Sequence, residues 1–139
     1  MSKKFVQSYL FFGGQCEEAI AFYKNALGAN VEMLMHYKDN PESSTNSDLP
    51  PGFENKVMHA SFTIGDTTIM ASDGCDVGAK FEGFRLSVAL PNEAEAKKAF
   101  QALSKGGKIN MPLEKTFWSP CFGMLTDQFG IGWMVTVAE

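Results

Sequence analysis

Cysteine is scarce in this chain, and its count is odd. The three cysteines, Cys16, Cys75 and Cys121, lie far apart in the sequence. An odd number without a close pair predicts neither a disulfide framework nor a zinc knuckle. Cys16 stands near the start of a predicted helix but on its apolar stripe, which favours a buried, unreactive thiol over an activated one. Unpaired cysteines are typical of a reducing compartment, so we expect a cytoplasmic protein.

Clustered positive charge and long apolar runs are also missing. The chain has 12 Lys and Arg residues, which are scattered, and its formal net charge is -4. Binding to phosphates needs gathered basic residues, so we expect no nucleic-acid partner. The N-terminal segment lacks the hydrophobic run of a signal peptide, and no later segment is long enough to span a bilayer. We therefore expect no membrane partner.

Apolar residues are plentiful, and their pattern repeats once along the chain. Of the 139 residues 45% are apolar, enough for one compact domain over residues 1–139. The first half predicts strands at 5–12, 30–37, 56–64 and 67–72, a helix from Cys16 to Gly28, and a surface loop at 38–55. The second half predicts strands at 84–90, 108–113, 121–126 and 131–137, with a helix from Glu93 to Gly106. This order indicates an α+β fold of two duplicated modules, about 1–80 and 81–139.

The alternation within these strands predicts two different faces for each sheet. One set of side chains is continuously apolar and is expected to face a helix. The other set mixes methionine, phenylalanine, hydroxyl groups, one histidine and one arginine, which suits an organic ligand with a polar end. The expected ligand-binding residues are His59, Arg85, Asp73, Ser72, Trp118, Phe122 and Met134.

Each of these residues also has a structural interpretation. A lone histidine on a strand, such as His59, is often a hydrogen-bonded structural residue. Arg85 can form a salt bridge with Asp73 or Glu82. Trp118 lies in an aromatic segment that suits a lid or a dimer contact, and simple packing explains it equally well. The methionines can fill the core or the walls of a cavity.

Several short motifs, taken in order, resemble one known family. They are CEEAIAFY at 16–23, KVMHA at 56–60, IMASD at 69–73, TFW at 116–118 and FGMLTDQFGIGWM at 122–134. Together they resemble the PhnB-like family, also labelled 3-demethylubiquinone-9 3-methyltransferase-like. This family belongs to the glyoxalase/bleomycin-resistance/extradiol-dioxygenase superfamily, also called vicinal oxygen chelate. The resemblance covers nearly the whole chain and implies paired βαβββ modules, each forming a cupped mixed sheet, in a homodimer.

The resemblance also implies positions for a divalent metal, near Ser8, Met70 or Ser72, Gly83 and Met134. Divalent ions prefer His, Asp, Glu or Cys ligands, which none of these positions supplies. We therefore expect no metal and no cofactor. A methyltransferase is not indicated either, because no Gly-rich loop follows the first strand to hold S-adenosylmethionine.

Two classes of function remain open from the sequence. The leading hypothesis is a metal-free protein that binds a small, partly aromatic organic molecule, with no assigned substrate. The alternative is an enzyme. It would be a metal-dependent lyase, isomerase or dioxygenase with His59 and Asp73 as substitute ligands, or an acid/base catalyst with His59 and with Arg85 as an anion anchor.

Overall fold

The structure is a computed structural model that describes residues 5–39, 52–74 and 80–138. The chain divides into two compact units, Met1–Ala79 and Lys80–Glu139. Most of the predicted surface loop at 38–55 lies outside the described residues, as does Cys75. Within the described ranges, every helix is too short or too polar to cross a membrane.

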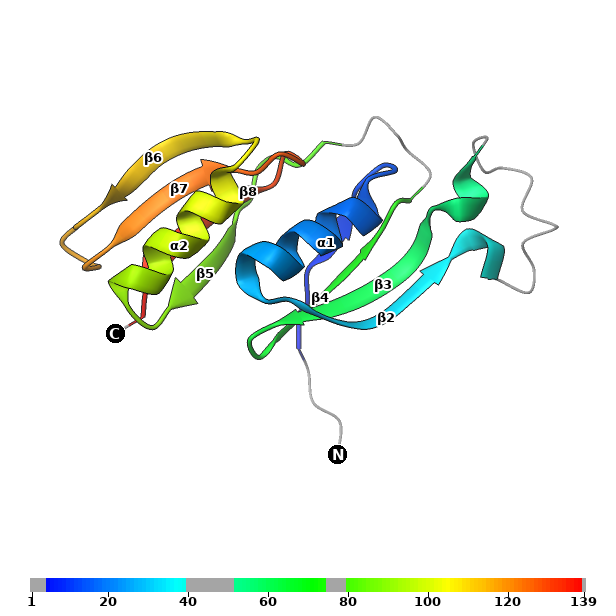
Figure 1. The fold of residues 1–139 in the computed structure, drawn as a ribbon, viewed down its shortest axis with the longest axis horizontal. Coiled ribbons are helices and arrows are strands. Elements are labelled where there is room, and N and C mark those ends of the chain that lie inside the picture. Colours follow the sequence, from blue (N-terminus) through cyan, green and yellow to red (C-terminus); the bar gives the residue numbers. More distant parts are fainter. Residues whose placement is uncertain (1–4, 40–51, 75–79, 139) are drawn as a thin grey trace. The chain divides into compact units, whose positions relative to one another are not determined.

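The first unit contains one sheet and one helix, with two short 3-10 turns. Its elements are β1 (Tyr9–Phe11), α1 (Cys16–Leu27), β2 (Asn30–His36), η1 (Tyr37–Asp39), η3 (Phe53–Asn55), β3 (Val57–Ile64) and β4 (Thr67–Ser72) (Figure 1). The sheet has the order β1-β4-β3-β2. β1 runs parallel to β4, while the other neighbours are antiparallel.

The second unit repeats this arrangement. Its elements are β5 (Leu86–Leu90), α2 (Glu93–Ser104), β6 (Lys108–Glu114), β7 (Phe122–Thr126) and β8 (Gly132–Val137). The sheet order β5-β8-β7-β6 and the parallel β5–β8 pair match the first unit strand for strand. The predicted α+β fold of tandem βαβββ modules is therefore confirmed. The first strand is shorter than predicted, because Phe5 and Val6 are 73% and 100% exposed and only 9–11 pair with β4.

The two helices begin and end for identifiable local reasons. Glu17 and Glu18 occupy the first turn of α1, where their negative charges interact favourably with the helix dipole. Gly28 ends α1 in a left-handed conformation with φ 70°. The side chain of Asn92 caps α2 by accepting a hydrogen bond from the backbone N–H of Glu95 at 2.9 Å. These signals explain why the sequence predicts both helices closely.

One helix packs on one face of each sheet (Figure 1). Tyr23 of α1 is 1% exposed, and its ring stacks on Phe62 of β3 with centroids 6.2 Å apart. In the second unit, a β-carbon on Gly123 of β7 would come within 2.8 Å of the Phe100 ring of α2. The absence of a side chain at Gly123 thus lets α2 approach its sheet closely. The buried strand residues on these faces include Leu10, Ala60, Ala71, Leu125, Trp133 and Val135.

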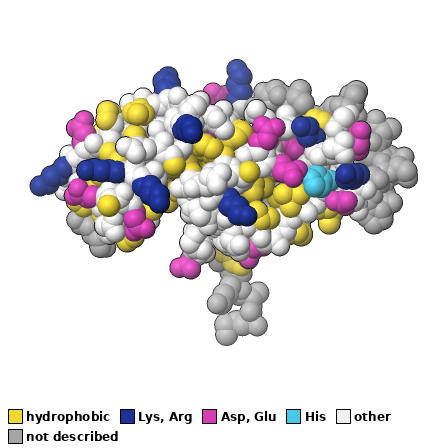
Figure 2. All heavy atoms as spheres, in the orientation of Figure 1, with side chains coloured by type: hydrophobic (Ala, Val, Ile, Leu, Met, Phe, Trp, Pro, Cys, Tyr) yellow, Lys and Arg dark blue, Asp and Glu magenta, His cyan; other side chains and the backbone are white. Residues whose placement is uncertain are grey.

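Charged side chains of both signs share the surface. On the face shown in Figure 2, Lys and Arg side chains are interspersed with Asp and Glu. This mixing agrees with the scattered basic residues of the sequence. On this face the charges gather into no patch of one sign.

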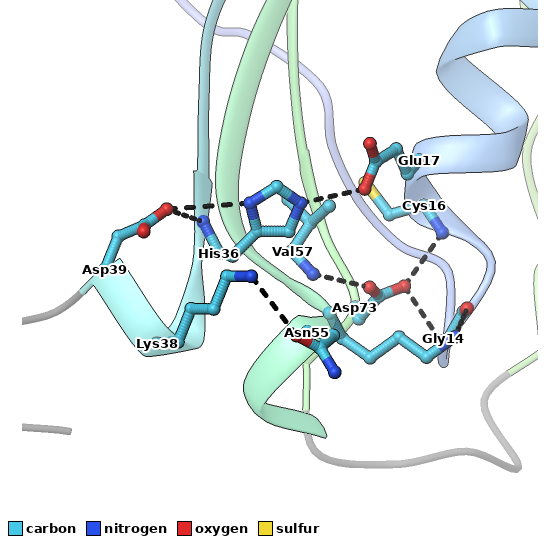
Figure 3. Close-up of polar contacts among 10 residues, drawn as sticks. Gly14, Cys16, Glu17, His36, Lys38, Asp39, Asn55, Val57 and Asp73 are labelled. Atoms are coloured by element: carbon cyan, nitrogen blue, oxygen red, sulfur yellow. Dashed lines mark hydrogen bonds and ion pairs between the residues drawn. The ribbon is translucent and has the colours of Figure 1, made fainter. Parts of the chain in front are cut away.

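A buried carboxylate joins three segments of the first unit. Asp73, which follows β4, is 1% exposed. Its Oδ1 accepts hydrogen bonds from the backbone N–H groups of Gly14 and Cys16, and its Oδ2 accepts one from Val57, each at 2.8 Å (Figure 3). Hydrogen bonds to an ionised acceptor are stronger than neutral ones. The end of β4 is thereby tied to the starts of α1 and β3.

We predict that Asp73→Ala lowers the free energy of unfolding by about 3 kcal/mol or more, because three backbone N–H groups, in two buried hydrogen bonds and one part-buried one, lose their acceptor. Urea unfolding followed by far-UV circular dichroism measures this change. The control is Asp66→Ala, which removes an exposed turn carboxylate and should cost less than about 1 kcal/mol. Equal effects of the two substitutions would contradict the bridging role of Asp73.

Candidate functional site

The sheet face of the first unit opposite α1 carries aromatic rings, methionines and small polar groups. Residues paired across neighbouring strands share a face, so the register defines which side chains lie together. One row runs Tyr9, Met70, Ser61 and Met33, and the next runs Phe11, Ser72, His59 and Met35. We call these eight residues the first open face. Ser72 is buried, at 2% exposure, while Tyr9 and Phe11 are 37% and 51% exposed.

His59 and Tyr9 form a polar pair on the first open face. The Tyr9 hydroxyl lies 3.0 Å from His59 Nδ1, and the two rings are 5.6 Å apart. The ring of Phe11 lies 4.9 Å from that of Tyr9. His59 Nε2 has no hydrogen-bond partner among the described residues. The Tyr9 hydroxyl thus orients the imidazole of His59 through Nδ1 and leaves Nε2 for another group.

The second unit has an equivalent face opposite α2. One row runs Ser87, Met134, Met124 and Met111, and the next runs Ala89, Thr136, Phe122 and Glu114. We call these eight residues, with Arg85 beside them, the second open face. Arg85 belongs to this face because a β-carbon on its neighbour Gly132 would lie 3.0 Å from Arg85 Cγ. The strand parity that the sequence predicts for Arg85, Phe122 and Met134 is therefore confirmed.

Most of the methionines lie on these two faces. The chain has eight methionines. Met33, Met35 and Met70 are on the first open face, and Met111, Met124 and Met134 are on the second, which makes six. The remaining two are Met1, outside the described residues, and Met58, which falls on the α1 side of β3. Unbranched, polarisable methionine adapts its shape to a contacting surface.

Trp118 contacts the edge of the second open face from a loop. Its ring lies 5.4 Å from Phe122, at an angle of 71°, and Phe122 is only 6% exposed. The loop is anchored by Ser119, whose hydroxyl lies 2.9 Å from that of Thr136. The neighbouring Phe117 is 97% exposed. Trp118 is thus fixed over Phe122, while Phe117 points to solvent.

Arg85 is held by neutral oxygens. Its Nη1 donates to the Leu125 carbonyl at 2.9 Å, to the Asn110 Oδ1 at 3.3 Å and to the Trp133 carbonyl at 3.4 Å. Among the described residues Arg85 has no ion pair, so the salt bridge with Glu82, one of the two structural alternatives for Arg85, is not formed. A half-buried guanidinium therefore lies on the second open face with its charge unpaired within the described ranges.

Asp73 lies on the helix side of the first sheet, whereas His59 lies on the opposite face. Cys16 is on the same side as Asp73, and its backbone N–H donates a hydrogen bond to it. The Asp73 carboxylate contacts the start of α1, so it is on the helix side of the sheet. This placement does not favour a metal shared by His59 and Asp73, and the described residues contain no cluster of three His, Cys, Asp or Glu able to hold a metal. Burial raises the pKa of the Cys16 thiol, and the carboxylates of Asp73 and Glu17 raise it further. Cys16 is thus the buried, unreactive thiol that its position on the apolar stripe favours.

Polar residues gather at a second place, beside α1. His36 Nε2 lies 2.8 Å from Glu17 Oε1, and its Nδ1 lies 3.5 Å from Asp39 Oδ2 (Figure 3). A neighbouring groove has a volume of about 380 Å³. Its lining residues are Gly14, Glu17, Glu18, Ala21, Asn55, Lys56 and Asp73. The groove lies on the helix side of the first unit, so it is separate from the first open face.

Sequence reasoning missed several residues of the open faces, namely Tyr9, Phe11, Met33, Met35, Met111 and Glu114, and also Asn110, which contacts Arg85. Tyr9 and Phe11 alternate with the buried Leu10 and Phe12, and this alternation was a signal that could have placed them opposite the helix. Asn110 had no such signal, because a register shift between β6 and β7 places it beside Arg85. The expected residues therefore fall into two groups, His59 and Ser72 in the first unit and Arg85, Trp118, Phe122 and Met134 in the second. That His59 and Arg85 contact one ligand stays a prediction.

Two βαβββ modules, each with one helix on one face of its sheet, define the fold of the glyoxalase/bleomycin-resistance superfamily. A glyoxalase-related enzyme from Fulvimarina pelagi has this fold, with a TM-score of 0.63 at 15% identity, and the match covers 98% of this chain and 89% of that one. At this identity the likeness concerns the fold alone.

The chain belongs to the family described as 3-demethylubiquinone-9 3-methyltransferase, whose pattern it matches over residues 3–136. It is 36% identical to protein YjdN of Escherichia coli over 137 residues, which cover 94% of this chain and 93% of that protein. The structure of PA1353 from Pseudomonas aeruginosa is similar with a TM-score of 0.85 at 36% identity, covering 97% and 98% of the two chains. The PhnB protein from Bacillus cereus has a TM-score of 0.79 at 30% identity, covering 97% and 100%. The predicted PhnB-like membership is confirmed.

Proposed function

We propose that this chain is a cytoplasmic, metal-free protein that binds a small, partly aromatic organic molecule on its open faces. The placement of six of the eight methionines on these faces, among exposed aromatic rings, carries the proposal. Buried core positions favour branched side chains with few conformations, whereas methionine-rich surfaces accept ligands of varied shape. The family description names a methyltransferase, but the proposal requires no methyl donor.

The expected ligand-binding residues have distinct roles in this proposal. On the second open face, Met134, Phe122 and Trp118 supply apolar contact to an aromatic ring. On the first open face, His59 offers one hydrogen bond through Nε2, and the buried Ser72 closes the sheet beside it. Asp73 acts indirectly, because its carboxylate fixes the strand end that carries Ser72.

An acid/base enzyme is the second candidate. The observation that favours it is the 3.0 Å contact between the Tyr9 hydroxyl and His59 Nδ1, which selects the orientation of the imidazole. A histidine held in this way is suited to accept or donate a proton at Nε2. No reacting group is assigned to the ligand, so binding is the proposed function.

We predict that benzamide, an aromatic and uncharged probe, shifts the methyl signals of open-face methionines in ¹³C-methyl NMR. Met70 and Met134 should respond, while Met58 on the helix side should not. His59→Ala should weaken binding by up to about tenfold, the worth of one neutral hydrogen bond. Lys24→Ala, at the exposed end of α1, is the control and should leave binding unchanged. If benzamide, phenol and indole at millimolar concentration all leave the open-face signals unmoved, the proposed function is wrong.

We predict that the purified protein carries no stoichiometric divalent metal. The positions that the superfamily uses for metal hold Ser8, Met70 or Ser72, Gly83 and Met134, whose side chains are poor ligands. Elemental analysis tests this directly. About one zinc, nickel, manganese or iron per chain, with a lower melting temperature after chelation, would overturn it.

We predict a symmetric homodimer. Phe117 is 97% exposed and Trp118 is 53% exposed, and adjacent exposed aromatic rings are typical of contact surfaces. Light scattering at micromolar concentration should give twice the chain mass of 15.2 kDa. Phe117→Ser should shift the mass toward the monomer, whereas Phe5→Ser, which removes an exposed ring elsewhere, should not. A monomer mass for the unmodified chain would refute the dimer.

A further inference from the structure

The side chain of Arg85 lies flat across the second sheet because position 132 has no side chain. A β-carbon on Gly132 would lie 3.0 Å from both Cγ and Nη1 of Arg85 and 3.3 Å from its Cζ. Such contacts are too short to be accommodated without moving the arginine. Gly132 thus opens a slot over β8 that directs the guanidinium across the sheet toward β7.

Within this slot, both hydrogens on Nη1 of the guanidinium are engaged in hydrogen bonds. Nη1 carries two hydrogens, and three neutral oxygens share them. The Asn110 oxygen also accepts a hydrogen bond from the Thr126 hydroxyl at 2.9 Å, which fixes its position. Nε and Nη2 have no acceptor within the described ranges. These two nitrogens form the edge of arginine that binds both oxygens of an oxyanion.

The charge pattern around Arg85 also favours an anion. The neighbouring row across the sheet runs Gly132, Thr126 and Lys108, so a second cation lies on the same face. The carboxylate of this face is that of Glu114, which stands at the opposite end of β6. Asn110 adds a donor, since its oxygen accepts two hydrogen bonds and its amide nitrogen has no partner in the part of the chain that the structure describes.

From these contacts we propose that Arg85, positioned by Gly132 and Asn110, forms a subsite for a carboxylate or phosphate group at the polar end of the ligand. This inference rests on the proposed function for the aromatic part of the ligand. It makes Arg85 the residue that selects anionic over neutral ligands. Gly132 is a positioning residue, because it acts through the arginine alone.

The test compares benzoate with benzamide, which share a ring and differ in charge. In the unmodified protein, benzoate should bind about tenfold to a hundredfold more tightly than benzamide, as expected for charge-assisted hydrogen bonds. Benzoate should also shift the Nε–H signal of Arg85 in ¹⁵N NMR. Phenyl phosphate, measured in the same way, shows which of the two oxyanions the subsite prefers.

Variants separate a binding role from a structural one. Arg85→Gln should remove most of the preference for benzoate, and Arg85→Lys should retain part of it, because lysine keeps the charge without the two-pronged geometry. Gly132→Ala should also reduce the preference although the arginine is still present. Lys97→Gln, which removes a positive charge from the exposed side of α2, is the matched control and should change nothing. If Arg85→Gln does not fold, the Nε–H signal of the unmodified protein and Gly132→Ala still decide the question.

The outcomes distinguish the subsite from the proposed function. Equal affinity for benzoate and benzamide would overturn the subsite and leave the aromatic binding site intact. Acetate or inorganic phosphate that shifts the Arg85 signal, with no binding of either aromatic probe, would support the subsite and refute the proposed function. The absence of any response would refute both.

Discussion

Each sheet of this chain has one helix to bury one of its faces, and the rest of the structure depends on this constraint. Burial of apolar surface stabilises the helix-facing set of side chains, so positions such as Phe62 and Trp133 are fixed by packing. Alternate positions are released from that requirement, because a strand sends successive side chains to opposite faces. Methionines, aromatic rings, one histidine and one arginine occupy the released positions. The composition of the open faces is therefore not fixed by packing against the helices.

Two acidic residues in the family motifs, Asp73 and Asp127, support the fold. Asp73 accepts three backbone hydrogen bonds, two at the start of α1 and one at the start of β3. Asp127 has a parallel role in the second unit, where Oδ1 accepts from the backbone of Phe129 and Ile131 and Oδ2 accepts from the indole of Trp133. Buried carboxylates that are satisfied in this way hold turns rigid. The rigid turns keep the strands in register, and the register decides which residues meet on the open faces.

Local signals in the sequence account for most of the fold, since glycine, the Asn92 cap and the alternation of apolar residues mark where elements start and stop. They also place His59 and Arg85 on the faces opposite the helices. The partners of these residues depend on contacts between distant segments. The pairing of Tyr9 with His59 spans 50 positions, and Asn110 reaches Arg85 through a register shift that no local pattern predicts. The role of Asp73 was missed for the same reason, because its three donors come from two other segments.

In the proposed function, the apolar and the polar residues of the open faces contribute differently, the first to affinity and the second to selectivity. Methionine and aromatic contacts grow with the apolar area that a ligand covers and depend little on its identity. A hydrogen bond from a fixed donor depends on geometry, and an ill-matched ligand leaves the donor unsatisfied. On the interior strands of the first open face His59 is the titratable side chain, and Arg85 is the cation that reaches over β8 in the second. If the proposed binding function holds, relatives with the same methionines but other residues at these two positions should bind ligands of similar shape and different polarity.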